Sequence, residues 1–182
     1  MKSKIKTNIF LAILVTLFSA SGASAAGIGN NIVVVLAGTG TAYDGNAQFE
    51  QFGLPPLDAL CFDMDLVDAK TGNVIGSGSD CLSDIAPGDD GSGLQLTATT
   101  FFYFPGGTLV SRGRVTVQPV TTGSTDFTHI TGAMPSPYDN NVMYGDGKFE
   151  NAYGSVRLSG AVNLGAFADG LIFFDCVFVI DI

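Results

Sequence analysis

The last twelve residues constrain the fold of this chain most strongly. In the segment LIFFDCVFVIDI, residues 171–182, every second side chain is apolar, and most of the side chains between them are apolar as well. Alternation with a period of two predicts a β-strand. The first parity holds Ile172, Phe174, Cys176, Phe178 and Ile180, and the second includes Leu171, Phe173, Val177 and Val179. We therefore expect both faces to be buried, one inside a barrel and the other beneath a second subunit.

Seven further segments have the pattern of strands separated by turns. They are residues 31–37, the two arms of a hairpin within 59–81, and residues 94–104, 108–117, 127–132 and 145–163. No helical period competes with them, and glutamate is restricted to Glu50 and Glu150, which argues against long surface helices. Closing eight strands into a ring would leave no open sheet edge. The sequence therefore predicts an all-β fold, an eight-stranded antiparallel β-barrel.

The segment 145–163 carries far more glycine than an ordinary strand. Glycine weakens a strand interior, so its repetition indicates bends, bulges or the close approach of another backbone. The residues concerned are Gly145, Gly147, Gly154 and Gly160. We expect them to mark the places where strands bend around a small barrel.

The first 25 residues have the pattern of an export signal. Lys2, Lys4 and Lys6 precede an apolar run over residues 9–18, and residues 23–25 supply a small-x-small cleavage sequence. A membrane anchor is the alternative, but an apolar run of about ten residues is short for a bilayer. We predict a signal peptide at 1–25, a single mature domain at 26–182, and a secreted or periplasmic location.

The charge balance narrows the choice of partner. Loss of the three signal lysines leaves five basic residues against 17 acidic ones, a net charge of −12. Nucleic acid and anionic membrane surfaces are therefore poor partners. A β-barrel of the outer membrane would require girdles of aromatic residues, and the chain contains no Trp. We expect no membrane insertion after signal cleavage.

The chain has three cysteines, an odd number for an exported protein. Counting outward from the turn at residues 68–73 brings Cys61 close to Cys81 on paired strands, which favours a disulfide between them. A bond between either one and Cys176 is the alternative. If the first pairing holds, the thiol of Cys176 is expected to be buried and inert.

Four motifs occur in an order that resembles a known superfamily. They are an aromatic strand and the glycine-bounded return strand that follows it, both within FYFPGGTLVSRG at 102–113, then HITGA at 129–133, and the hairpin pattern GDGKFENAYGSVRL at 145–158. Together they resemble the allene oxide cyclase and dirigent protein superfamily, most clearly over residues 94–164. The resemblance implies an eight-stranded antiparallel barrel, a trimer in the plant members, and an apolar cavity that holds a reactive organic molecule.

This resemblance also implies a class of function. Such barrels act chiefly by confining one conformer of their ligand. We therefore expect a protein that binds a hydrophobic small molecule and, if it has an activity, guides cyclisation, isomerisation or stereoselective coupling. Residues 32–36 contain no glutamate of the kind expected in allene oxide cyclases, and Tyr153 stands where dirigent proteins carry arginine. A non-catalytic exported binding or structural barrel is the alternative.

Several side chains are candidates for the site. Tyr153 leads them, because a phenol can donate to a ligand oxygen, and Phe102 and Phe104 are candidate ligand contacts on an aromatic strand. Asp63 and Asp65 share one parity. Inside a barrel their carboxyl groups would be acids or counter-ions, but their apolar neighbours favour an outward position.

The remaining polar residues give no catalytic pattern. His129 has no serine or cysteine nucleophile pattern beside it, and we expect it to be hydrogen-bonded near the barrel mouth. Arg112 and Arg114 are expected on the outside or at an interface. The spacing of cysteine, histidine and aspartate matches neither a zinc site nor an EF-hand. We therefore expect no metal and no cofactor, a hydrophobic small molecule as ligand, and a homo-oligomer as the assembly.

Overall fold

A computed structural model describes residues 31–89, 91–121, 126–136 and 138–182. The predicted signal peptide at 1–25 lies outside these residues. The described chain contains ten strands, one short α-helix and two 3₁₀ turns. The strands are β1 (Ile32–Thr41), β2 (Tyr43–Asp44), β3 (Leu60–Asp68), β4 (Val74–Pro87), β5 (Leu94–Phe104), β6 (Gly107–Pro119), β7 (His129–Ala133), β8 (Val142–Gly145), β9 (Ser155–Asn163) and β10 (Leu171–Asp181). The helix is α1 (Asn46–Gln51), and the 3₁₀ turns are η1 (Gly147–Phe149) and η2 (Phe167–Asp169).

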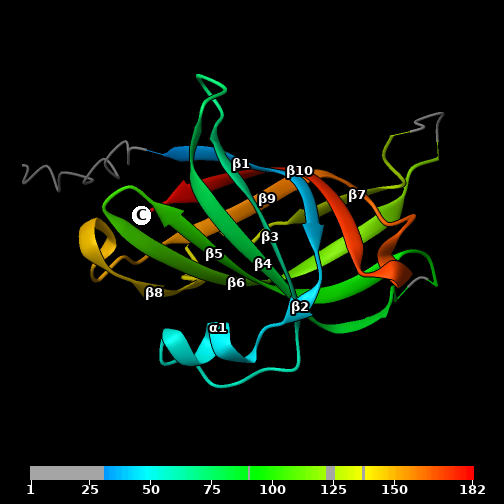
Figure 1. The fold of residues 1–182 in the computed structure, drawn as a ribbon, viewed down its shortest axis with the longest axis horizontal. Helices are drawn as coiled ribbons and strands as arrows, with labels where there is room; N and C mark the ends of the chain where they lie inside the picture. Colours follow the sequence, from blue (N-terminus) through cyan, green and yellow to red (C-terminus); the bar gives the residue numbers. More distant parts are fainter. Residues whose placement is uncertain (1–30, 90, 122–125, 137) are drawn as a thin grey trace, which may run out of the picture.

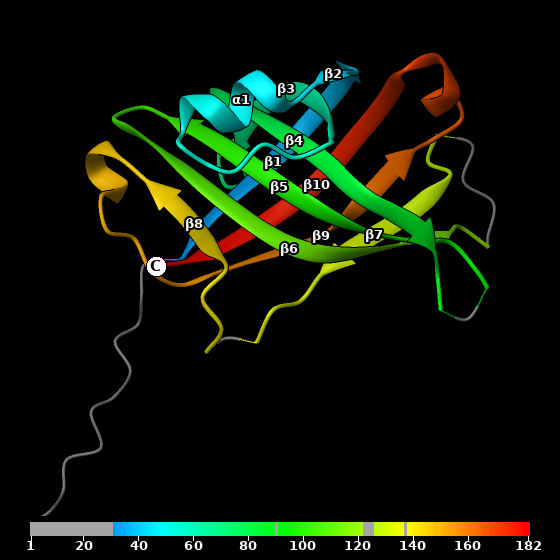
Figure 2. The same ribbon diagram turned by 90° about the horizontal axis from the view of Figure 1, so that it is seen from below.

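Eight of the strands close into an antiparallel barrel. Their order around the barrel is β1, β10, β9, β7, β6, β5, β4 and β3, and β3 pairs back with β1. The two short strands are additions, because β2 extends the pairing of β3 and β8 pairs with β6. Figures 1 and 2 show the long strands crossing the barrel obliquely. The predicted fold is therefore confirmed.

The glycine-rich segment is not one strand. It ends β8 at Gly145, turns through η1 and resumes as β9 at Ser155. Gly147 has φ +55, and a Cβ there would collide with the backbone of the neighbouring β5–β6 turn. A Cβ on Gly160 would lie 2.6 Å from the Cα of Cys176, so glycine allows β9 and β10 to approach closely. The glycines thus serve a turn and a close contact.

The side chains on one face of β10 point into the barrel, as predicted. Ile172, Phe174, Cys176, Phe178 and Ile180 are all buried in the main core. Its outward parity is different, since Leu171, Phe173 and Val177 remain 38–39% exposed in the single chain. The expectation that both faces are buried is therefore not met within one chain, and the second subunit that was expected to cover the outer face stays a prediction.

The outer faces of β5, β6 and β8 have a cover that the sequence did not predict. Phe49 of α1 packs edge-on against Phe101, with ring centroids 5.6 Å apart, and Phe52 packs against Tyr144. These rings form a second core together with the two cysteines Cys61 and Cys81. The outward aromatic residues of β5 therefore pack against α1 and the residue that follows it, Phe52. Figure 2 shows α1 lying on the outside of the barrel.

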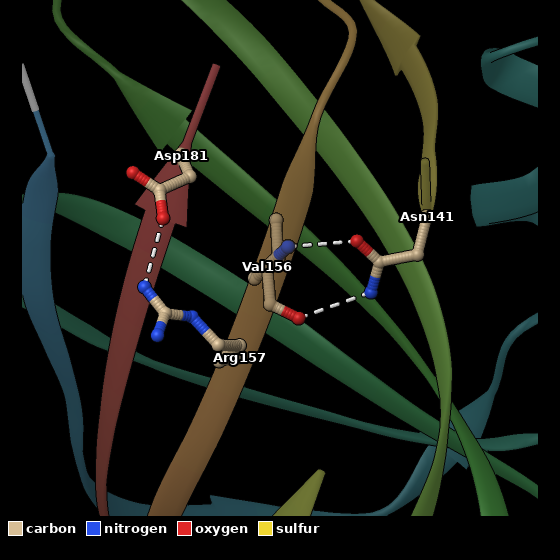
Figure 3. A network of polar contacts seen from close by, with 4 residues as sticks. All are labelled: Asn141, Val156, Arg157 and Asp181. Atoms are coloured by element: carbon tan, nitrogen blue, oxygen red, sulfur yellow. Dashed lines mark hydrogen bonds and ion pairs between the residues drawn. The ribbon is translucent and has the colours of Figure 1, made fainter. Parts of the chain in front are cut away.

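An asparagine completes the barrel wall between β6 and β9. The side-chain amide of Asn141 accepts a hydrogen bond from the backbone N–H of Val156 at 2.7 Å and donates one to its carbonyl at 3.0 Å (Figure 3). The backbone carbonyl of Asn141 accepts from the N–H of Arg112 at 2.9 Å. The side-chain amide thus replaces the backbone ladder beyond the end of β7, where β7 no longer lies between β6 and β9. On the other side of β9, Arg157 forms an ion pair with Asp181 at 2.8 Å.

Candidate functional site

An apolar cavity lies inside one end of the barrel. Its free volume is about 40 Å³. It is lined by Asp80, Leu82, Ile85, Leu94, Leu96, Ala98, Val115, Val117, Thr131, Leu158, Val162, Leu164, Phe167, Ile172 and Phe174. All but Asp80 and Thr131 are apolar, so the cavity offers hydrophobic contact with very few polar groups. This combination is typical of small-molecule sites.

Asp80 is the one titratable residue among the side chains that line this cavity. It lies on β4 opposite Phe62 of β3 and Thr100 of β5, and it shares the inward parity of Leu82. Only 2% of the residue is exposed. The hydroxyl of Thr100 donates a hydrogen bond of 2.7 Å to its carboxyl group. A buried carboxyl group in an apolar barrel is the most unusual chemical feature of the interior.

The surroundings change the acidity of this carboxyl group. Burial raises the pKa of Asp80 from 3.8 to about 6, and the hydrogen bond from Thr100 opposes that rise. The group is therefore poised to exchange a proton near neutral pH, either as an acid–base group or as a counter-ion to a ligand. Burial also raises the pKa of Cys176, and the negative charge of Asp80 adds to the effect. The thiol of Cys176 is thus held neutral.

The two ends of the barrel differ. At the cavity end, Ile85 is 42% exposed, while Leu94, Leu164 and Phe167 are half-buried, so the cavity reaches the surface between them. At the opposite end, the ring of Phe149 packs 5.0 Å from that of Phe104. The Lys148 ammonium covers both rings at about 5 Å. A ligand would therefore enter at the Ile85 end.

The predicted ligand contacts occupy other places. Phe102 and Phe104 point inward, but they stack on each other at the packed end of the barrel, where Phe102 also packs edge-on against Phe178 and Phe104 packs against Phe149. Tyr153 lies between η1 and β9 with 70% of its surface exposed. None of these three residues lines the cavity. Their role in binding a ligand stays a prediction.

Asp63 and Asp65 point outward from β3, as their apolar neighbours indicated. Asp63 accepts hydrogen bonds from the hydroxyl of Tyr43 at 2.8 Å and from the hydroxyl of Ser79 at 2.5 Å. Burial, with the nearby carboxylate of Asp63 as a smaller cause, raises the pKa of Tyr43 to about 12. Asp63 therefore organises a polar contact on the outer wall, outside the cavity.

The cysteines have the predicted arrangement. Cys61 and Cys81 lie opposite each other on β3 and β4 and form a disulfide within the core beneath α1. Cys176 is free and buried. A disulfide indicates an oxidising environment, because disulfides form and persist in oxidising compartments. His129 is half-buried with its Nδ1 2.8 Å from the Thr128 hydroxyl, in agreement with the expected hydrogen-bonded position.

Asp80 was not predicted, although the sequence carries a signal for its position. Cys81 was placed in the hairpin, and its two neighbours, Asp80 and Leu82, necessarily share the opposite face. Assigning Leu82 to the interior would have placed Asp80 beside it. The hairpin was predicted to end at residue 81, and β4 in fact continues to Pro87.

Other kinds of site find no support in the described part of the chain. No group of three or more histidine, cysteine, aspartate or glutamate side chains there is arranged to hold a metal ion. No helix within the described ranges is long and apolar enough to cross a membrane.

No protein-family model matches this chain, and neither curated proteins nor solved structures match it significantly. The relationship to allene oxide cyclases and dirigent proteins therefore stays a resemblance of motifs.

Proposed function

We propose that this protein is a small-molecule-binding barrel that takes the apolar part of its ligand into the cavity beside Asp80. The observation that carries the proposal is a cavity, open at one end of the barrel and walled by aliphatic and aromatic side chains, with one carboxyl group among them. Apolar contacts supply affinity at such a site, and the few polar groups fix the orientation of the ligand.

The size of the cavity favours binding over catalysis. A volume of about 40 Å³ accommodates only a few water-sized groups, whereas sites that enclose a drug-sized molecule have roughly 300–1,000 Å³. A slim end of the ligand therefore enters, and the remainder lies at the rim formed by Ile85 and Phe167. Guiding a cyclisation requires the reacting atoms to be held together in one conformer. A cyclase or dirigent-type activity is a second candidate, supported by the motifs at 102–113 and 145–158.

The proposed setting is outside the cytoplasm. The Cys61–Cys81 disulfide supports an oxidising compartment, and the sequence pattern of residues 1–25 supports export to the periplasm or the medium. A homo-oligomer is also proposed, since the outward apolar residues of β10 are left exposed in the single chain. Nucleic acid is not a proposed partner, because the mature chain is strongly acidic.

Native mass spectrometry of protein purified from its exported fraction tests the binding function. We expect an adduct of a small hydrophobic compound that is released on denaturation. Ala98→Leu places extra side-chain volume in the cavity and should abolish the adduct, whereas the neighbouring Thr97→Leu adds volume on the outer face of β5 and should retain it. Equal adducts in both variants would contradict binding in this cavity, and so would protein that never carries a ligand.

A further inference from the structure

We infer that the ligand is an apolar amine whose ammonium group pairs with the carboxylate of Asp80. This inference rests on the proposed binding function and adds the chemical class of the ligand. Three features carry it: the position of the carboxyl group in the cavity wall, the charges around that group, and the charge of the whole molecule.

Among the residues that the structure describes, none supplies the Asp80 carboxylate with a cationic partner in the cavity. Thr100 gives it one hydrogen bond, and every other side chain lining the cavity is uncharged. A buried charge without a counter-charge is unfavourable, because the protein interior replaces its hydration poorly. An ammonium group supplies that counter-charge, and the apolar walls bury the carbon chain attached to it. The cavity thus has the chemistry of a site for an amphiphilic cation.

The same charges disfavour other apolar ligands. A fatty acid or another carboxylate would place a second negative charge beside Asp80, inside a mature chain whose net charge is −12. A neutral alcohol can donate a hydrogen bond, but it leaves the carboxylate charge uncompensated. The acidic surface also attracts cations from solution and repels anions. Charge complementarity therefore favours an amine both while it approaches the acidic surface and once it lies beside Asp80.

The groups that surround Asp80 set the pH dependence of this pairing. Its neighbour on β3 is Phe62, its neighbour on β5 is Thr100, and the titratable group that faces it from β10 is the thiol of Cys176. Towards the mouth, His129 shares the inward parity of Thr131 on β7. The exposed carboxylates of Asp84 and Asp169 lie on the elements that form the rim, and Lys148 is at the opposite end.

Titration of three probes with one carbon skeleton tests the inference. Hexylamine, hexan-1-ol and hexanoate are added to the mature protein at pH 7.5, and binding is followed through the methyl NMR signals of the cavity residues Leu96, Leu158 and Ile172. We expect hexylamine to bind at least tenfold more tightly than hexan-1-ol, and hexanoate to bind most weakly. Lowering the pH to 5 should weaken hexylamine binding about tenfold, because it protonates most of Asp80.

Two substitutions separate the cavity carboxylate from the acidic surface. Asp80→Asn should reduce hexylamine binding to the level of hexan-1-ol and remove the pH dependence. Asp63→Asn, which removes a carboxylate from the outer wall, should leave hexylamine binding unchanged, and His129→Gln should leave its pH profile unchanged.

The possible outcomes test the amine inference and the proposed binding function separately. Equal binding of amine and alcohol, or hexylamine binding unaffected by Asp80→Asn, would overturn the inference and leave a neutral apolar site. The absence of any shift at the cavity methyl groups with all three probes would overturn the proposed binding function as well.

Discussion

Replacing Asp80 by Asn should stabilise the ligand-free protein at pH 8 and have little effect at pH 4. Burial raises the pKa of this carboxyl group from 3.8 to about 6, so the folded state binds its proton more tightly than the unfolded state. Between these two values the folded state holds more protons, and its stability therefore falls as pH rises. Above pH 6 the loss is complete. A shift of about two pKa units corresponds to a loss on the order of 3 kcal/mol.

The asparagine side chain is neutral at every pH, and its carbonyl oxygen can still accept the hydrogen bond from the Thr100 hydroxyl. Urea unfolding of both proteins under non-reducing conditions, at intervals from pH 4 to pH 8, gives the difference in free energy of unfolding at each pH. We expect the advantage of Asp80→Asn to grow from near zero to about 3 kcal/mol. The exposed control Asp65→Asn should change stability by less than about 0.5 kcal/mol. A difference that is constant with pH, or that grows in favour of the natural protein, would refute the reasoning.

Three further predictions concern the structure around the site. Reduction of the Cys61–Cys81 disulfide should lower the free energy of unfolding by about 2–4 kcal/mol, and an unchanged denaturant midpoint in the presence of reductant would contradict its structural role. Asn141→Ala should cost about 2–4 kcal/mol, because it leaves the N–H and carbonyl of Val156 without their side-chain partner; hydrogen exchange at the Val156 amide should become faster, and unaltered exchange would argue against the wall contact. Cys176 should resist iodoacetamide at pH 8 in the folded protein, because burial raises the pKa of its thiol; mass spectrometry should detect labelling only after unfolding, and rapid labelling of the folded form would be inconsistent with its position.

The barrel was predictable because its main signal is local. Each long strand carries its own alternation, and the parity that the sequence assigned to Ile172 and Phe174 is the inward parity. The Cys61–Cys81 pair was predictable for a similar reason, since a short hairpin fixes which residues face each other. Both features depend on a few consecutive residues and a turn.

The missed features depend on contacts between distant segments. Helix α1 has only six residues, too few for a helical period to stand out. It is stabilised by packing Phe49 against Phe101, about fifty positions away along the chain. The role of Asn141 as a substitute for a strand likewise appears only when β6 and β9 are in place. A polar residue such as Asp80 inside a barrel contradicts the rule that charged groups face water, and sites of this kind are where sequence patterns are expected to fail.

A crystal structure of the mature protein grown with hexylamine at pH 7.5 would test the central claim most directly. We expect a hexylamine molecule with its nitrogen within hydrogen-bond distance of the Asp80 carboxylate, the adjoining carbons among Leu96, Leu158 and Phe174, and the rest of its chain at the rim of the cavity. An empty cavity, with the amine bound only at the outer carboxylates of Asp63 and Asp65, would contradict it.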